Sequence, residues 1–207
     1  MKKPLSLIRK GAAVAVVATM ALSGSVLGQG KAEIGKVKFD SLPSPTVDSG
    51  KSKSFKPKDW LEFEAGIKLP AFNQEQKDAG FVDQVVVKWS VALKNPDGRG
   101  FILITKDITH INIPIDEEVY TAVFLSPNTL KRVTGSDSAG KSSVDRVAVE
   151  VLVNGRTVAA ESSKGKPDWV SSGSLSDQSR RFPLLNKYET PFKMLWWDRY
   201  AEIQEQR

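Results

Sequence analysis

The sequence predicts an all-β protein: an antiparallel β-sandwich followed by an amphipathic helix at its C-terminal end. Three observations lead to this fold class. Apolar and polar residues alternate in several separate runs, as they do in half-buried strands. Short turns rich in Gly, Asn and Pro separate these runs, with no long helical segment between them, so neighbouring strands run antiparallel. Helical spacing of apolar residues occurs only near the end of the chain.

The fold is organised around two apolar runs, 84–94 and 101–115, which we expect to pair as a hairpin across the polar turn 95–100. The first run places Val85, Val87, Trp89, Val91 and Leu93 on one face. The second changes phase between its early and late isoleucines. A single inserted residue produces such a change, which predicts a β-bulge near Thr109–His110.

Further strands are predicted before and after this pair in the sequence. The Asn154-Gly155 dipeptide is a strong hairpin signal between two of them, and Ser126-Pro127 predicts one helical turn over 127–133. The additional strands fall at 60–69, 118–126, 144–153 and 156–161, and a further short strand is expected within 31–40. The predicted core contains Leu61, Phe63, Val85, Val87, Trp89, Val91, Ile102, Ile104, Val123, Val147, Val149 and Val151.

Thr190-Pro191 is a capping pair that predicts the start of the C-terminal helix. Apolar residues then recur at helical spacing in the main stripe Phe192, Leu195, Trp196, Tyr200 and Ile203, with a second, narrower stripe of Met194, Trp197 and Ala201. A helix that is apolar on two sides either packs deeply or contacts a partner, so Met194 and Trp197 are candidate partner-binding residues.

The chain is expected to divide into a signal peptide, a short extension, a β-sandwich and the helix, at 1–28, 29–57, 58–186 and 187–207. The first segment has four basic residues and then the apolar run 11–27, which is typical of a secretory signal cut before Gln29. An uncleaved anchor and a pilin-type leader cut at Lys10-Gly11 are the alternatives. Val16 stands where a pilin leader usually has Glu.

Charge and cysteine content restrict the function. The formal net charge of +6 includes the four cations of the leader, and removing them leaves 26 cations against 24 acids. A nearly neutral mature chain gives no general attraction to nucleic acid or anionic membranes, so contact with the membrane is expected only through the leader. An exported chain without cysteine has no disulfides and must rely on its core.

Gly135–Ser142 satisfies the phosphate-loop formula G-x-x-x-x-G-K-[ST], but its context is wrong. A phosphate loop follows a buried strand and opens a helix, whereas a predicted strand follows here. His110 is the single histidine, with Asp107 and Asp116 as its nearest acids, which is too few ligands for zinc. We therefore expect no nucleotide, metal or other cofactor.

Two carboxylate pairs, Glu62/Glu64 and Glu117/Glu118, are formal candidates for sugar hydrolysis. One strand cannot place two carboxylates on opposite sides of a substrate, and no G-x-S-x-G nucleophile motif is present. The sequence therefore predicts no enzyme and no catalytic residues. Trp60 opens a strand and Trp169 lies in a polar loop, so these two residues are candidates for stacking on a glycan.

The leader, the cysteine-free β core and the closing run 190–200 (TPFKMLWWDRY) together resemble a small family of exported proteins from Akkermansia-type Verrucomicrobia, encoded among type IV pilus genes. The resemblance implies an immunoglobulin-like sandwich, a place in the cell envelope and a non-enzymatic role in pilus assembly or adhesion. It implies no catalytic residues.

The expected function is therefore that of a non-catalytic envelope protein, located in the periplasm, on the outer surface or secreted. It would act by self-association or by binding another pilus or envelope component. The alternative is a carbohydrate-binding module that uses exposed tryptophans.

Overall fold

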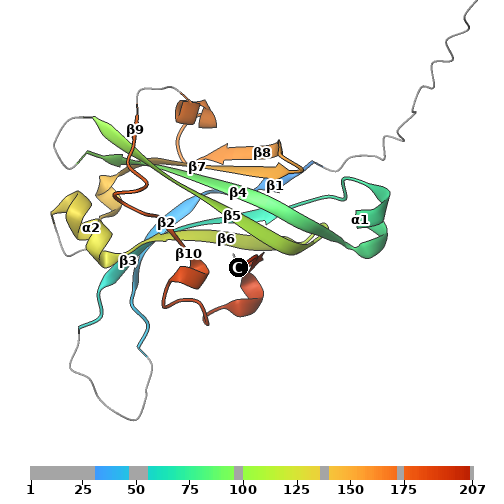
Figure 1. The fold of residues 1–207 in the computed structure, drawn as a ribbon, viewed down its shortest axis with the longest axis horizontal. Coiled ribbons are helices and arrows are strands. Elements are labelled where there is room, and N and C mark those ends of the chain that lie inside the picture. Colours follow the sequence, from blue (N-terminus) through green and yellow to red (C-terminus); the bar gives the residue numbers. More distant parts are fainter. Residues whose placement is uncertain (1–30, 47–55, 96–99, 136–139, 172–174, 206–207) are drawn as a thin grey trace, which may run out of the picture.

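The computed structural model describes residues 31–46, 56–95, 100–135, 140–171 and 175–205, which form two mainly antiparallel sheets (Figure 1). The predicted signal peptide, 1–28, lies outside the described residues.

The first sheet has the order β1-β3-β6-β10, with β2 also paired to β3. Strand β3 runs antiparallel to β6 on one side, and β1 and β2 share its other side. The strands are β1 (Glu33–Ile34), β2 (Lys38–Pro43), β3 (Asp59–Lys68), β6 (Glu118–Leu125) and β10 (Leu185–Asn186).

The second sheet has the order β11-β5-β4-β7-β8, with β9 also paired to β5. Its centre is the predicted hairpin, since β4 and β5 pair antiparallel from Phe81↔Pro114 to Lys94↔Phe101. Asn154 and Gly155 both have positive φ and form the predicted turn between β7 and β8. The strands are β4 (Phe81–Lys94), β5 (Phe101–Pro114), β7 (Val144–Val153), β8 (Arg156–Ser162), β9 (Ser176–Asp177) and β11 (Glu202–Ile203).

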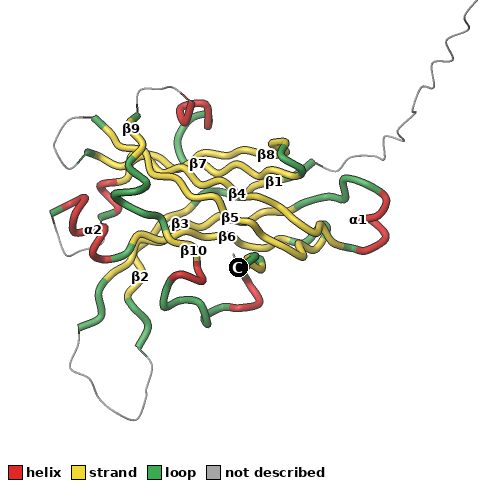
Figure 2. The backbone as a smooth tube through the Cα atoms, viewed as in Figure 1, coloured by secondary structure: helices red, strands yellow, loops and turns green. Residues whose placement is uncertain are grey.

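Two short helices lie at opposite ends of the sheets (Figure 2). Helix α2 (Pro127–Thr134) begins as predicted, with the Ser126 hydroxyl accepting a hydrogen bond from the Thr129 amide and Gly135 closing the helix in the left-handed region. Helix α1 (Gln74–Ala79) lies between two predicted strands, where the sequence predicts no helix, and the Asn73 side chain caps it. The absence of an apolar stripe in α1 explains why hydrophobic periodicity missed it.

One hydrophobic core lies between the two sheets. Phe63 from β3, Trp89 from β4 and Val123 from β6 are all fully buried in it. Every residue of the predicted core list is buried, which confirms the period-two interpretation of the strands.

The predicted β-bulge near Thr109–His110 is wrong. The β4–β5 register is unchanged from one end to the other, so no residue is inserted. Asn112 instead adopts a left-handed conformation with φ +55°, at the position opposite Asp83 where the two strands are not paired. In both strands the buried residues switch from odd to even positions, or the reverse, on passing this point. Because the switch occurs in both strands at the same place, their register stays the same.

The predicted C-terminal helix is also wrong. Residues 187–205 form two 3₁₀ turns, a β-bridge and strand β11. Trp196 has φ +50° and ψ +44°, so the chain leaves the right-handed helical region in the middle of the predicted helix. An isolated helix of this length is marginal, and pairing with two sheet edges is the stronger interaction.

Strands β1 and β2 pair with β3, so residues 33–43 of the predicted N-terminal extension belong to the first sheet. Strand β2 ends at Pro43 within this extension, and residues 47–55 lie outside the described residues.

Candidate functional site

The segment Leu185–Glu205, here called the C-terminal strap, connects the two sheets along their open side. It starts as β10 on the edge of β6, returns to β6 where the Ala201 amide donates to the Tyr120 carbonyl at 2.9 Å, and ends as β11 on the edge of β5. Figure 1 shows the strap in red, close to β6 and the C-terminus. The strap therefore holds the two sheets together.

An aromatic cluster fixes the strap on the outer face of the first sheet. Phe192 is buried and stacks on Phe124, with ring centres 5.2 Å apart. Trp60 meets Phe192 edge-on at 5.6 Å, and its indole N–H donates to the Ser44 hydroxyl at 3.1 Å. Trp60, a candidate for glycan stacking, is thus a packing residue beneath the strap.

A polar cluster fixes the next part of the strap to β3. The Tyr200 hydroxyl lies 2.6 Å from Glu64 Oε2 and 3.1 Å from Glu62 Oε1, and Arg199 donates to Glu64 at 2.8 Å. Burial raises the pKa of Glu62, although the Tyr200 hydroxyl acts in the opposite direction. These two carboxylates, formal candidates for hydrolysis, therefore bind the strap, and both project from one strand.

The second carboxylate pair, Glu117/Glu118, also has a structural use. The Glu118 carboxylate accepts a hydrogen bond from the Tyr120 hydroxyl at 2.9 Å. It lies against the backbone of β3, where a Cβ at Gly66 would come within 2.5 Å of Glu118 Oε1. Glu118 thus fills the space that the glycine leaves between β3 and β6.

The strap turns three large apolar side chains toward solvent. Met194 is 76% exposed, Trp196 50% and Trp197 48%. Tyr188 stacks against Trp197 at 5.7 Å with the rings 13° from parallel. We call Met194, Trp196 and Trp197 the aromatic surface. It contains both residues expected to bind a partner from the helix, and adds Trp196, which the helical spacing places in the main stripe.

Lys187 is a buried residue that contacts Trp197 of the aromatic surface. Only 3% of Lys187 is exposed, and its ammonium group donates to the Lys193 carbonyl at 3.2 Å while lying 4.9 Å from the centre of the Tyr200 ring and 5.7 Å from that of Trp197. Burial lowers the pKa of Lys187. A buried cation between two rings limits the movement of Trp197. No sequence pattern indicates this role, because a lysine in a polar segment is normally exposed.

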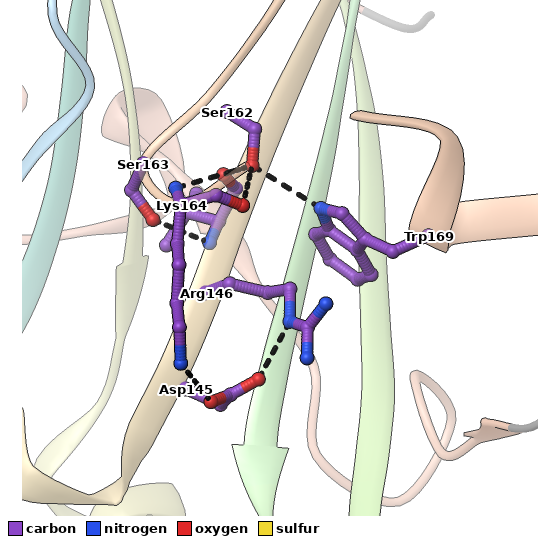
Figure 3. A network of polar contacts seen from close by, with 7 residues as sticks. Asp145, Arg146, Ser162, Ser163, Lys164 and Trp169 are labelled. Atoms are coloured by element: carbon purple, nitrogen blue, oxygen red, sulfur yellow. Dashed lines mark hydrogen bonds and ion pairs between the residues drawn. The ribbon is translucent and has the colours of Figure 1, made fainter. Parts of the chain in front are cut away.

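Trp169 does not provide an exposed platform (Figure 3). It is 7% exposed, its indole N–H donates to the Ser162 hydroxyl at 3.2 Å, and the Arg146 guanidinium lies 5.5 Å from its ring centre. Asp145 holds Arg146 at 2.6 Å and Lys164 at 3.3 Å. This network attaches the loop after β8 to the second sheet, so the residue expected to stack on a glycan has a packing role.

His110 is a buried link between the sheets. Its Nδ1 lies 3.1 Å from the Glu202 carbonyl oxygen and must donate to it, so the neutral ring accepts at Nε2 from the Thr121 hydroxyl at 2.8 Å. Thr121 in turn accepts from the Trp89 indole at 3.4 Å. Burial lowers the pKa of His110 to about 4. Both ring nitrogens are engaged, and this histidine connects β5, β6 and β11.

The elements on either side of the phosphate-loop match occur in the opposite order to those of a nucleotide site, where a strand precedes the loop and a helix follows it. Helix α2 precedes the match and strand β7 follows it. Positions 136–139 lie outside the described residues, and Lys141 is paired with Asp40 at 2.5 Å. In the part of the chain that the structure describes, no three His, Cys, Asp or Glu residues come together as a metal site.

A helix long and apolar enough to cross a membrane does not occur in the described ranges.

These observations define a class: a two-sheet β protein whose sheets are joined by a C-terminal strap with an exposed aromatic surface. A crystal structure of a protein from Akkermansia muciniphila is 34% identical, with a TM-score of 0.77, and the match covers 86% of this chain and 94% of that chain. A protein-family model matches residues 25–207. The chain belongs to this family, which it shares with the Akkermansia protein. No curated protein matches the sequence.

Proposed function

We propose that this protein is an exported, non-catalytic component of the cell envelope that works in type IV pilus assembly or adhesion through protein–protein contacts. The observation that carries the proposal is the aromatic surface, in which two tryptophans and a methionine are about half or more exposed on a strap that the buried Phe192 and Ala201 anchor. Tryptophan and methionine are enriched at protein interfaces, and tryptophan also at their hot spots.

The secretory composition of the leader supports export, to the periplasm, the outer surface or the medium. The resemblance of the sequence to exported Akkermansia-type proteins is the basis of the envelope role, and the two sheets with their shared core are consistent with a sandwich of the immunoglobulin-like type. The partner is a second copy of the chain or another pilus or envelope component.

A non-catalytic role agrees with how the candidate groups are used. His110 engages both ring nitrogens in structural hydrogen bonds, and Glu62 and Glu64 bind Tyr200 and Arg199. The carbohydrate-binding alternative loses the residues it was based on, because Trp60 and Trp169 are both packed into the fold.

The first test is the mass in solution of the protein beginning at Gln29, measured by light scattering over a series of concentrations. We expect a defined oligomer, which Trp197→Ala combined with Met194→Ser converts to monomer because the substitutions remove the apolar contact. Phe101→Ala is the matched control, since Phe101 is also exposed but lies at the far end of β5.

An oligomer that survives the double substitution would contradict a role for the aromatic surface in self-association. A protein that is monomeric at every concentration would contradict self-association itself and leave a different envelope component as the partner to be tested on the same surface.

A further inference from the structure

Strand β5 has one edge that is paired only at its two ends. Toward its start, β9 pairs in parallel with Ile102 and Leu103, and toward its end β11 pairs antiparallel with His110 and Ile111. These are two-residue strands. Two short segments of the chain thus already bind this edge by strand addition.

The hydrogen bonds at both ends show which residues point their backbone groups outward. The Leu103 carbonyl accepts from the Gln178 amide, the Thr105 amide donates to the Ser179 hydroxyl, and the Thr109 carbonyl accepts from the Gln204 amide. All three β5 residues are odd-numbered. Because backbone groups alternate between the two sides of a strand, the amide and carbonyl of Asp107 also face this edge.

Asp107 lies at the centre of the stretch Thr105–Thr109, here called the β5 gap. Neither β9 nor β11 extends to it, and among the described residues no backbone hydrogen bond reaches its amide or carbonyl from the edge side. Its side chain is exposed and lies 3.9 Å from Lys88. The gap therefore offers an amide and a carbonyl in the geometry that an added strand requires.

A groove of about 1150 Å³ runs along the β5 gap. Strand β5 forms one wall and the 3₁₀ turn 187–189 the other, while Ile108, Ile111 and Ile203 provide apolar lining. The groove thus combines an open backbone edge with apolar side chains, which is how extended peptides are bound.

Two ion pairs lie at the groove. Lys106 pairs with Glu189 at 2.8 Å across the groove, and Lys193 pairs with Glu205 at 3.3 Å. The first pair joins the strap to β5, and the second joins two parts of the strap to each other.

The two long strands of the first sheet, β3 and β6, differ from β5 because other strands pair with both of their edges. Strand β3 is covered by β1 and β2, and β6 is covered by β10 and the Tyr200 bridge.

The outer edge of β8 has no strand paired to it among the described residues, but it is protected in another way. The Ser163 amide donates to the Val147 carbonyl on the β7 side, so the neighbouring Ser162 amide points outward, and it is already bound by the Glu161 carboxylate at 3.0 Å. A register irregularity at Val151/Leu152 also distorts the β7–β8 ladder. Such features oppose strand addition at β8.

We propose that the β5 gap binds an extended peptide segment of a partner protein, which adds to the second sheet as a short strand between β9 and β11. This deepens the proposed function, on which it rests, by naming the partner's form: an extended segment with an apolar side chain directed at Ile108 and Ile203. Tyr188 lines the groove and stacks on Trp197, so the groove continues into the aromatic surface.

The test compares Asp107→Pro with Asp107→Ala. Proline removes the outward amide and leaves the ladder to β4 intact, because that amide points away from β4. Alanine removes the carboxylate and keeps the amide. The probe is a random linear dodecapeptide library displayed on phage and selected against the protein beginning at Gln29. We expect selected peptides to bind the wild type and Asp107→Ala alike and to bind Asp107→Pro at least about tenfold more weakly.

Amide hydrogen exchange on the wild type provides a second measurement that needs no variant. A bound peptide should slow exchange at Asp107 and Thr109 and leave the already paired amides unchanged. Peptides that bind Asp107→Pro as tightly as the wild type, or a selection without any peptide that protects the Asp107 amide, would overturn the proposal. So would protection of Asp107 that rises with protein concentration alone, because the segment would then come from a second copy.

The two proposals can fail separately. In one outcome, substitution of the aromatic surface abolishes the oligomer, and peptides bind Asp107→Pro as tightly as the wild type. This outcome would support the proposed function and contradict the role of the β5 gap. In the other outcome, Asp107→Pro weakens peptide binding, but substitution of Trp197 and Met194 leaves the mass in solution unchanged. This outcome would support the β5 gap as a binding site and contradict the role of the aromatic surface.

Discussion

At the scale of single residues, His110 shows how burial decides what a titratable group can do. Its sequence neighbourhood indicates only a histidine near a strand irregularity. In the fold it is 1% exposed and bridges the sheets through Thr121 and the Glu202 carbonyl. A neutral ring satisfies both contacts, whereas a charged ring would have to be desolvated, and for that reason the pKa is lowered to about 4.

This lowered pKa predicts a loss of stability in mild acid. Between pH 6.5 and about 4 the unfolded chain binds a proton at His110 and the folded chain does not, so the free energy of unfolding falls as the pH falls. The contribution of the neutral His110 to the free energy of unfolding is fully present above pH 6.5. Its loss at pH values below about 4 lowers the free energy of unfolding by about 3 kcal/mol. Urea denaturation at several pH values measures it.

His110→Gln is the matched variant, because glutamine can donate and accept but does not titrate in this range. The difference between the two pH profiles isolates the histidine from carboxylates such as Glu62. Profiles that remain parallel from pH 6.5 to about 4 would show that His110 is not held neutral by the fold.

At the scale of elements, the C-terminal strap differs most from its prediction. The apolar spacing of Phe192, Tyr200 and Ile203 is helical in the sequence, but these residues serve different places. Phe192 and Tyr200 pack on the outer face of the first sheet, and Ile203 packs against the core between the sheets. In a straight helix these three residues would lie on the same stripe and face one surface, so they could not reach both locations.

The Tyr200 hydroxyl is predicted to stabilise the strap. Tyr200→Phe removes the group shared by Glu62 and Glu64, and it should lower the free energy of unfolding by about 1–2 kcal/mol because both carboxylates lose a hydrogen bond. The pKa of Glu62 should rise further, since the hydroxyl is among the groups that lower it. Urea denaturation and NMR titration of the Glu62 carboxyl measure the two effects.

Tyr188→Phe is the control, because the Tyr188 contacts that the structure provides are ring contacts. Its stability should stay within about 0.5 kcal/mol of the wild type. Equal stabilities for Tyr200→Phe and the wild type would mean that solvent replaces the hydroxyl and that the polar cluster contributes nothing to holding the strap.

At the scale of the whole molecule, the strap adds a covalently continuous link between two sheets that also share a core. It covers one edge of β6 and part of one edge of β5, leaving the β5 gap between its own β11 and β9. Covering an edge prevents unspecific strand pairing, so a short gap in a covered edge is a selective place for a partner to bind.

Removal of the strap should therefore destabilise the protein and make it associate. A chain that ends at Leu184 loses the Phe192 packing and the two edge pairings, which we expect to cost about 3 kcal/mol or more. Light scattering should show association that rises with concentration, since both edges become open. A chain that ends at Glu205 is the control, and an unchanged unfolding midpoint and mass after truncation at Leu184 would contradict this role of the strap.

Local pattern was enough to predict the elements whose final environment agrees with it. Alternation in 84–94 and 144–153 identified the strands and their buried faces, and Asn154-Gly155 identified a turn, because a half-buried strand and a tight turn each constrain residues that are neighbours in the chain.

The positions of the aromatic residues followed instead from long-range contacts. Trp169 is covered by Arg146, Trp60 by Phe192, and Trp197 is left half exposed. The β5 gap likewise depends on where β9 and β11 end on a strand that is distant in sequence. These properties arise from contacts between segments separated by many residues, and no local periodicity encodes which segment will cover which face.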